Sequence, residues 1–131
     1  MLAAALEPQA HIASATSRDL VGKAKKLFSQ QLDRASLNAN EIAQALGVSM
    51  RTLHRSFASE QLTVAGTLRA MRVQLASHML DQNRFNHLSV AEIGRRCGFM
   101  DVSHFVRTYK KTFDDTPAHW RKNAKNLAQT R

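Results

Sequence analysis

The sequence predicts an all-α protein, in which seven helices form two helix-turn-helix subdomains joined by a long connecting helix. A short residue pattern occurs twice in the 131 residues, once around Gly47 and again around Gly98. Apolar residues recur at helical rather than strand spacing, between breaks made mainly by Gly, Asn, Ser and Asp. With 44% hydrophobic residues the chain can also bury a real core, so wholesale disorder is not expected.

The two copies of the pattern have the same order of helix, turn and helix. The first copy consists of Asn40-Glu41-Ile42-Ala43, Gly47, Leu53, Arg55 and Phe57, and the second of Ala91-Glu92-Ile93-Gly94, Gly98, Phe105, Arg107 and Tyr109. The offset is 51 residues up to the glycines and 52 residues after them, so the second turn holds one extra residue. Each copy has a short helix, a tight turn at the glycine and a second helix with an apolar inner face, which is typical of a helix-turn-helix.

Two cap signals begin the helices that precede the first turn. Thr16 opens a capping box ahead of a helix near residues 18–34. Asn38 begins a short helix that ends at Leu46, and Gly47 is the expected left-handed residue of the turn.

Two more helices are predicted after the first turn. Ser49 caps a helix over residues 50–60, in which Leu53 and Phe57 face inward. A connecting helix of about 19 residues follows, because one apolar stripe continues along it. The stripe consists of Val64, Leu68, Met71, Leu75 and Met79.

The second copy repeats this plan. Ser89 opens a capping box, Gly98 makes the turn, and the next helix begins at Asp101 or Val102 with Phe105 on its buried side. These signals place the second helix-turn-helix after the connecting helix.

The last helix is predicted to begin at Thr116, a cap residue, with Pro117 at the first helical position. Cys97 is the only cysteine, which excludes an intramolecular disulfide, and its inward position predicts a buried small hydrophobe rather than a reactive thiol. The predicted domains are a linker or N-terminal extension at 1–16, a first helix-turn-helix subdomain at 17–62, the connecting helix at 63–83 and a second helix-turn-helix subdomain at 84–131.

The charge of the chain favours a polyanionic partner. Nineteen Lys and Arg against ten Asp and Glu give a formal net charge of +9, and residues 95–131 alone carry nine bases against three acids. A basic excess in folded segments most often marks a nucleic-acid binder. A plain solvated basic surface is the alternative explanation.

Other bulk features exclude further classes of protein. No run of about 18 apolar residues is present, so no membrane-spanning segment is expected. The stretch Leu2–Leu6 is too short, and lacks the basic flank, for a secretory signal. We therefore expect a reducing, cytoplasmic setting.

One extended set of residues identifies a family. It consists of Glu92-Ile93-Gly94, Gly98-Phe99, Ser103-His104-Phe105, Arg107, Tyr109-Lys110-Lys111, Phe113, Thr116-Pro117 and Trp120-Arg121. Over about residues 18–124 the chain resembles the DNA-binding domain of the AraC family of transcription regulators. The resemblance implies a regulator, more commonly an activator, that binds double-stranded DNA, with RNA polymerase as a further partner and with neither a cofactor nor a metal ion.

Three positions depart from the family pattern. Gln61 and Asp114 stand where a glycine is common after the recognition helices, and Asp adopts the left-handed conformation more readily than Gln does. Gly94 replaces the usual alanine, which is expected to weaken its short helix by up to about 1 kcal/mol.

Side chains that point away from each subdomain core are the expected base contacts. In the first copy the resemblance assigns this role to Arg51, His54 and Arg55. An arginine can bind O6 and N7 of a guanine with two hydrogen bonds, which discriminates between bases by about 1–3 kcal/mol. In the second copy the corresponding residues are Val102, Ser103, His104, Val106 and Arg107.

These assignments have alternatives. An exposed arginine can instead form a surface salt bridge, and exposed histidines are commonly inert. Val102 and Val106 offer only apolar contact, for instance with a thymine methyl. The first copy is therefore expected to carry most of the base specificity, and the second to act more as an anchor.

Phosphate contacts position a protein on DNA without depending on base sequence. Helix N-termini are favourable places for them. The expected phosphate contacts are Ser49, Lys110, Lys111, Thr116, Arg121 and Lys122.

The length of the connecting helix leads to a prediction about the DNA site. A helix of about 19 residues is about 28 Å long, and successive major-groove faces are about 34–36 Å apart. One chain is therefore expected to reach two adjacent major grooves of an asymmetric site of about 20 base pairs, with the DNA bent or one unit docked less fully.

Rival functions fit the sequence less well. The six histidines show no metal-ligand spacing with carboxylates, and no phosphate loop or nucleophile motif is present, so catalysis is not expected. A basic helical interaction module that binds an acidic protein partner is the main alternative, but it does not predict the repeated pattern. RNA binding is disfavoured because the chain lacks the aromatic-rich sheet of common RNA-binding modules.

The opening residues resemble an interdomain linker more than the start of a domain. Many family members have a sensing and dimerisation domain before this part, and others consist of this part alone. The sequence favours a C-terminal piece or truncated form of a longer effector-responsive regulator, whose N-terminal effector-binding or dimerisation domain is missing here.

Overall fold

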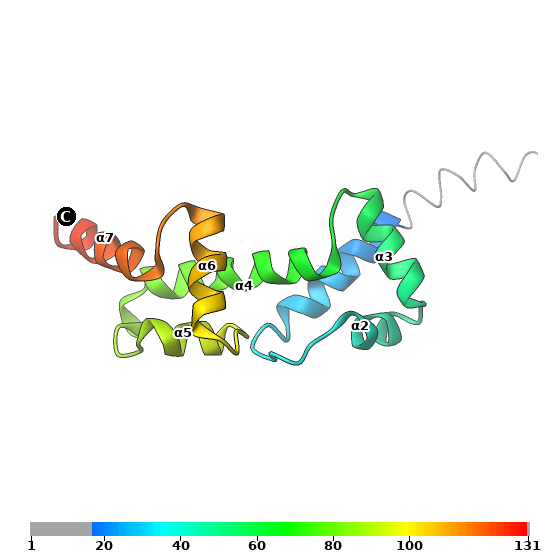
Figure 1. The fold of residues 1–131 in the computed structure, drawn as a ribbon, viewed down its shortest axis with the longest axis horizontal. Helices are drawn as coiled ribbons and strands as arrows, with labels where there is room; N and C mark the ends of the chain where they lie inside the picture. Colours follow the sequence, from blue (N-terminus) through cyan, green and yellow to red (C-terminus); the bar gives the residue numbers. More distant parts are fainter. Residues whose placement is uncertain (1–16, 131) are drawn as a thin grey trace, which may run out of the picture. The chain divides into compact units, whose positions relative to one another are not determined.

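The computed structural model describes residues 17–130, and the side chains up to residue 127. Within this part the chain forms seven α-helices and one short 3-10 helix and has no strand, which confirms the predicted fold class (Figure 1). After a helix over residues 17–29, the elements are α2 (Ala39–Leu46), α3 (Met50–Ser59), α4 (Val64–Asp81), η1 (Asn83–Phe85), α5 (Val90–Arg96), α6 (Val102–Phe113) and α7 (Pro117–Thr130). The predicted linker at 1–16, including the Thr16 cap, lies outside the described residues.

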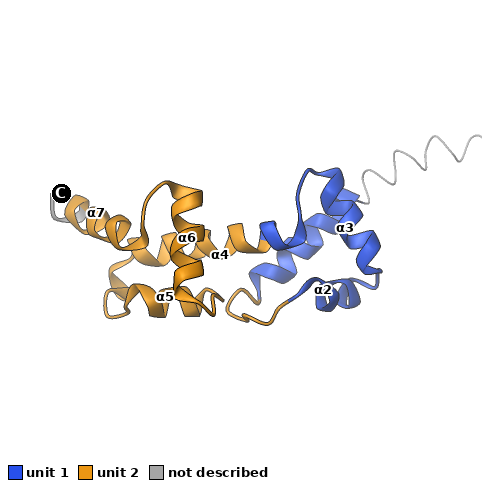
Figure 2. Cartoon of the chain, in the orientation of Figure 1, with its two compact units in different colours: residues 1–30, 38–67 blue, residues 31–37, 68–131 orange. Residues whose placement is uncertain are grey.

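The chain divides into two compact units (Figure 2). Unit 1 contains the residues up to 30 together with 38–67, and unit 2 contains 31–37 together with the residues from 68 onward. The helix α4 begins in unit 1 and continues in unit 2. The chain therefore passes from one unit to the other three times.

The first helix is shorter than predicted. It ends at residue 29 instead of near residue 34. Beyond it, the amides of Arg34 and Leu37 donate to carbonyls three residues earlier, at 3.0 Å and 3.2 Å, which is a turn geometry and not an α-helical one. The prediction followed the apolar spacing as far as Leu32, which is buried in unit 2 and does not extend the helix.

Unit 1 has a small core formed by its three helices and the start of α4. The ring centroids of Phe28 and Phe57 lie 6.2 Å apart. Ile42 of α2, Leu53 of α3 and Val64 of α4 are buried as well. The predicted inward positions of Leu53 and Phe57 are thus confirmed, and this burial fixes which face of α3 points away from the core.

The helix α4 buries more of its surface than the predicted single stripe. Met71 and Leu75, which belong to that stripe, are only partly buried, whereas Val73 and Ala76, which do not, are fully buried. The reason is that other parts of unit 2 pack on α4 from more than one side. One of them is the segment 31–37, which Arg72 contacts.

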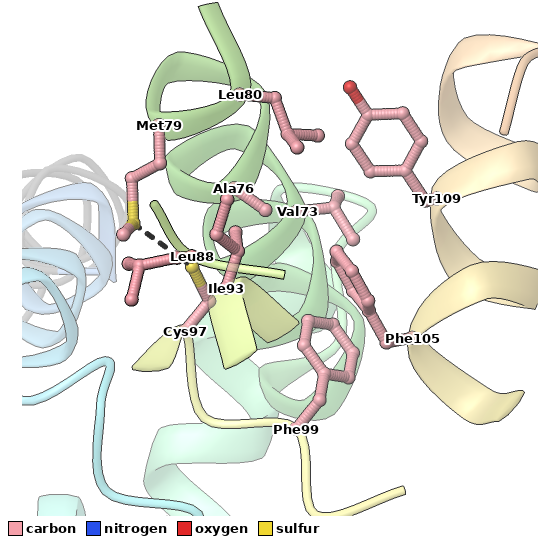
Figure 3. Packing of buried hydrophobic residues seen from close by; sticks show 10 residues of the cluster. All are labelled: Val73, Ala76, Met79, Leu80, Leu88, Ile93, Cys97, Phe99, Phe105 and Tyr109. Atoms are coloured by element: carbon pink, nitrogen blue, oxygen red, sulfur yellow. Dashed lines mark hydrogen bonds between the residues drawn. The ribbon is translucent and has the colours of Figure 1, made fainter. Parts of the chain in front are cut away.

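The core of unit 2 lies between α4, α5 and α6 (Figure 3). Aromatic rings connect its elements, with centroids 5.1 Å apart for Phe99 and Phe105, 5.9 Å for Phe105 and Tyr109, and 6.0 Å for Tyr109 and Trp120. The Trp120 indole N–H also donates to a carboxylate oxygen of Asp81 at 2.8 Å. These contacts join α6 to the α5–α6 turn on one side and to α7 on the other.

Gly94 has a packing role besides the weakening of α5 that the sequence predicts. A Cβ atom at this position would lie 2.6 Å from Cδ2 and 2.9 Å from Cγ of Phe105. Because Phe105 is fully buried, its ring has little space into which it can move. The glycine therefore allows α5 and α6 to pack closely.

Replacing Gly94 with alanine is expected to lower the free energy of unfolding by about 1–3 kcal/mol, because overpacking outweighs a helix-propensity gain of about 1 kcal/mol. Urea-induced unfolding measures this change. The matched control is Gly22→Ala, since an added Cβ at that helical glycine has nothing within 4 Å and should stabilise the chain. A Gly94→Ala variant more stable than the original chain would contradict the packing argument.

Candidate nucleic-acid interface

The first helix-turn-helix is formed by α2 and α3. The Asn38 side chain accepts a hydrogen bond from the Glu41 amide at 3.0 Å and so begins α2. Gly47 ends α2 with a φ of 69°, as predicted for the left-handed turn residue. Ser49 then caps α3, because its hydroxyl oxygen accepts from the Thr52 amide at 3.1 Å.

The outer face of α3 carries the predicted base-contacting residues. Arg51, His54 and Arg55 are exposed and lie at i, i+3 and i+4, so they share one side of the helix. Among the described residues no carboxylate lies within salt-bridge distance of Arg51 or Arg55. The face therefore offers two arginines that form no salt bridge with any described residue.

The second helix-turn-helix is formed by α5 and α6. Ser89 and Glu92 form the predicted capping box, and the hydrogen bonds from Ser89 hold the pKa of Glu92 below its ordinary value. Gly98 makes the turn with a φ of 94°. Asp101 is the N-cap of α6, because its carboxylate accepts from the Ser103 amide at 3.0 Å.

The outer face of α6 differs from that of α3 in its chemistry. Val102, Ser103 and Arg107 are exposed there, whereas Val106 is half-buried and so has less surface to offer than predicted. The His104 ring is exposed but packs edge-on against Phe99, with centroids 5.6 Å apart. The structure therefore brings one arginine, one hydroxyl and one apolar group together on this face.

A buried arginine, which sequence reasoning missed, holds the α5–α6 turn. Within unit 2 the Arg72 guanidinium donates from Nε to the Leu32 carbonyl at 3.1 Å and from Nη2 to the Arg34 carbonyl at 2.5 Å. Only 8% of Arg72 is exposed, and burial lowers its pKa. A Cβ at Gly98 would lie 2.2 Å from the same Leu32 carbonyl and 2.5 Å from Nε of Arg72.

This contact fixes where α6 begins. The turn, the arginine and the segment 31–37 meet so closely at residue 98 that only a glycine fits. Local sequence gave no signal of it, because the two carbonyls lie 38 and 40 residues from Arg72 in the chain.

The predicted phosphate contacts lie near the end of α6 and the start of α7. Lys110 and Lys111 are exposed in the last turn of α6, where positive charge is favoured by the helix dipole. Thr116 is the cap of α7, because its hydroxyl accepts from the His119 amide at 3.2 Å. Lys122 is exposed on α7.

Arg121 differs from the other predicted phosphate contacts. Its guanidinium is half-buried and donates to the carbonyls of Leu88 at 2.6 Å and Phe85 at 3.3 Å. These bonds hold the segment between η1 and α5 against α7. The structure thus gives Arg121 an internal role that the sequence did not predict.

Cys97 is buried at the end of α5, as predicted. Its thiol lies 3.6 Å from the Met79 sulfur, and burial raises its pKa to about 12 although Arg72 acts in the opposite direction. The thiol is therefore protonated near neutral pH and unreactive.

Sites of other kinds are not found in the described part of the chain. It contains no group of three or more His, Cys, Asp or Glu side chains placed to hold a metal ion. No helix in the same part has the length and the apolar composition needed to cross a membrane.

Two helix-turn-helix units define the class of this protein. In each unit the core and the caps fix the second helix, and its outer face carries arginine together with other exposed side chains that can form hydrogen bonds. This arrangement is that of a helix-turn-helix DNA-binding protein.

Comparisons with known proteins identify the family. Residues 42–123 match the family model of a helix-turn-helix domain. The chain is 35% identical over 100 residues to the transcriptional activator NphR of Rhodococcus sp., covering 76% of this chain and 29% of NphR. It is 32% identical over 94 residues to the HTH-type transcriptional activator RhaS of Escherichia coli (strain SE11), covering 71% of this chain and 33% of RhaS. The chain thus spans about a third of the length of these curated relatives.

A solved structure agrees with this result. The transcriptional regulator of Chromobacterium violaceum with an AraC-type DNA-binding domain is 29% identical, with a TM-score of 0.75 over 84% of this chain and 96% of that one. The chain belongs to the AraC family of transcription regulators, and it carries their DNA-binding domain. Membership confirms the resemblance found in the sequence and the expectation that the chain is a regulator and not an enzyme.

Replacing Arg72 with methionine is expected to lower the free energy of unfolding by about 2–4 kcal/mol, because each buried carbonyl left without a partner costs about 1–3 kcal/mol. Arg72→Lys should recover part of the loss, since an ammonium can bind one of the two carbonyls. Urea-induced unfolding measures both. Arg69→Met, at an exposed position of the same helix, is the control and should change stability by less than about 0.5 kcal/mol. Equal stability of the Arg72 and Arg69 variants would contradict the role of Arg72.

The stability of the chain is expected to fall as the pH rises from about 9 to about 12. Over this window the unfolded chain loses the Cys97 proton first, since the thiol pKa rises from 9.0 to about 12 on folding. Burial also raises the pKa of Tyr109, so Cys97→Ala should make the fall shallower without abolishing it. Urea midpoints between pH 8 and pH 11 measure this, and identical slopes for the two chains would contradict it.

Proposed function

We propose that this chain binds double-stranded DNA sequence-specifically as a transcription activator, with α3 and α6 in adjacent major grooves of one asymmetric site. The observation that carries the proposal is that the second helix of each helix-turn-helix presents an arginine whose charge no described carboxylate pairs, on a face that the core does not use. An exposed, unpaired guanidinium beside other polar groups suits guanine in a major groove.

The base contacts are proposed from these outer faces. Arg51, His54 and Arg55 supply hydrogen bonds from α3, and this face carries more of the base specificity. The face of α6 carries one arginine where the face of α3 carries two, so it offers fewer N–H donors, and Arg107 is its strongest group. The base contacts from α6 are Val102, Ser103, His104, Val106 and Arg107, with the smallest share from the half-buried Val106.

Phosphate contacts complete the interface. Lys110, Lys111 and Lys122 are exposed and suit phosphate oxygens. The capped N-termini of α3 at Ser49 and of α7 at Thr116 present backbone N–H groups to the same kind of ligand. Arg121 contributes indirectly, by holding the chain before α5, because its guanidinium already binds two carbonyls.

The tandem order of the units and the length of α4 support the proposal of an asymmetric site. The 18 residues of α4 span about 27 Å, less than the 34–36 Å between successive major-groove faces. A bend in the DNA, or shallower docking of one unit, makes up the difference. Activation, with RNA polymerase as the partner, is proposed because NphR and RhaS are transcriptional activators.

Selection of bound duplexes from random DNA tests this function. The selected site should be asymmetric and about 20 base pairs long, and Arg55→Ala and Arg107→Ala should each relax base preference in a different half, by about 1–3 kcal/mol at one position. The control is Arg69→Ala, an exposed arginine on α4 outside both outer faces. Affinities by fluorescence anisotropy at two salt concentrations complete the measurement.

Three outcomes would contradict the proposal. A short palindrome occupied by two chains would remove the asymmetric site. If both arginine variants bound all DNA sequences more weakly with unchanged base preference, Arg55 and Arg107 would be phosphate contacts and not base contacts. Equal affinity for DNA, heparin and an acidic protein would favour a basic interaction module instead.

A further inference from the structure

Exposed apolar side chains lie at the start of α3 and at the start of α6, the two helices that carry the outer faces. Four large hydrophobic residues are exposed in the described part of the chain, and Leu127 on α7 is one of them. The other three are Met50, the first residue of α3, Val102, the first residue of α6, and Met100, two residues before α6. Met100 is the most exposed of the four, at 84%.

The backbone on both sides of Met100 is fixed. Phe99 before it is buried, packs on Phe105, and donates its amide to the Gly94 carbonyl at 3.0 Å. Asp101 after it caps α6, and its carbonyl accepts from the Phe105 amide at 3.0 Å. Met100 is therefore held at the entrance to α6 with its side chain in solvent.

Met100 is also the residue that the second turn has in excess of the first. Gly47 and Ser49 are separated by one residue, whereas Gly98 and Asp101 are separated by two. The buried Phe99 takes the place next to the glycine and Asp101 takes the cap, so neither the core nor the cap uses Met100. Because it lies at the entrance to α6, Met100 is available to contact a ligand of the outer face of this helix.

We infer that Met100, with Val102 beside it, contacts the 5-methyl group of a thymine in the half of the site bound by α6, and so determines base specificity there. The inference rests on the proposed function. Residues at the N-terminal end of a recognition helix approach base edges, and the thymine methyl is the apolar group of the major groove. Ser103 and Arg107 on the same face supply the polar contacts beside it.

Removing the methyl group alone tests this contact. Deoxyuridine replaces each thymidine of the selected site in turn, which keeps every hydrogen bond of the base. The full chain should bind about fourfold more weakly at one or two positions in the half defined by Arg107→Ala, the factor that corresponds to one buried methylene-sized group. Met100→Ala should bind the thymine site about fourfold more weakly and lose most of its sensitivity to deoxyuridine at that position, where only Val102 remains.

Two variants control for other effects. Met100→Leu keeps an apolar side chain of similar reach and should retain the sensitivity to deoxyuridine. Leu127→Ala removes another exposed hydrophobe, outside the helix-turn-helix, and should bind all the duplexes as the original chain does.

The possible results separate this inference from the proposed function. Unchanged binding at every deoxyuridine position, or a half-site without a preferred thymine, would overturn the inference while Arg107→Ala still upholds the function. Equal weakening of Met100→Ala on thymine and deoxyuridine duplexes would overturn it as well, since Met100 would then contact the sugar-phosphate backbone or act through the fold. If Met100→Ala bound every duplex as the original chain does, the inference would be overturned, and the exposed Met100 side chain would instead suit a contact with a protein partner. Absence of any sequence preference would refute the function itself.

Discussion

The hydrogen bonds from Arg72 to two main-chain carbonyls are the constraint on which unit 2 depends. Burying a guanidinium costs free energy unless its N–H groups find partners, and here Leu32 and Arg34 provide them. Because Gly98 packs against the same group, the arginine also limits the path of the α5–α6 turn. The start of α6, and with it the direction of its outer face, is set by a contact between a buried side chain and the main chain.

The core and the proposed interface lie on opposite sides of the same helices. Phe105 and Tyr109 hold α6 through ring contacts, and Leu53 and Phe57 hold α3. Each of these side chains is buried, so the exposed faces contribute little to folding. Substitutions on the outer faces, where we propose the base contacts, should therefore leave the units stable, whereas the inner faces tolerate little change.

Local signals in the sequence predicted most of the fold, because caps and turns depend on neighbours in the chain. The caps at Ser49 and Ser89 and the left-handed Gly47 are of this kind. Features made by distant segments were missed or misjudged. Gly94 was judged by helix propensity although Phe105 determines its role. The candidate interface followed from inward and outward positions, but the half-burial of Val106 and the internal bonds of Arg121 depend on packing that no local pattern reports.

Residues 31–37 belong to unit 2 although they lie within the sequence of unit 1. A genetic exchange with a single crossover in α4 before residue 72 would therefore combine Arg72 from one parent with the carbonyls of Leu32 and Arg34 from the other. Carbonyls are the same in every residue, so the contact survives such recombination as long as the turn keeps its shape. Evolution can thus exchange one helix-turn-helix for another through α4, provided that the arginine and Gly98 are inherited together.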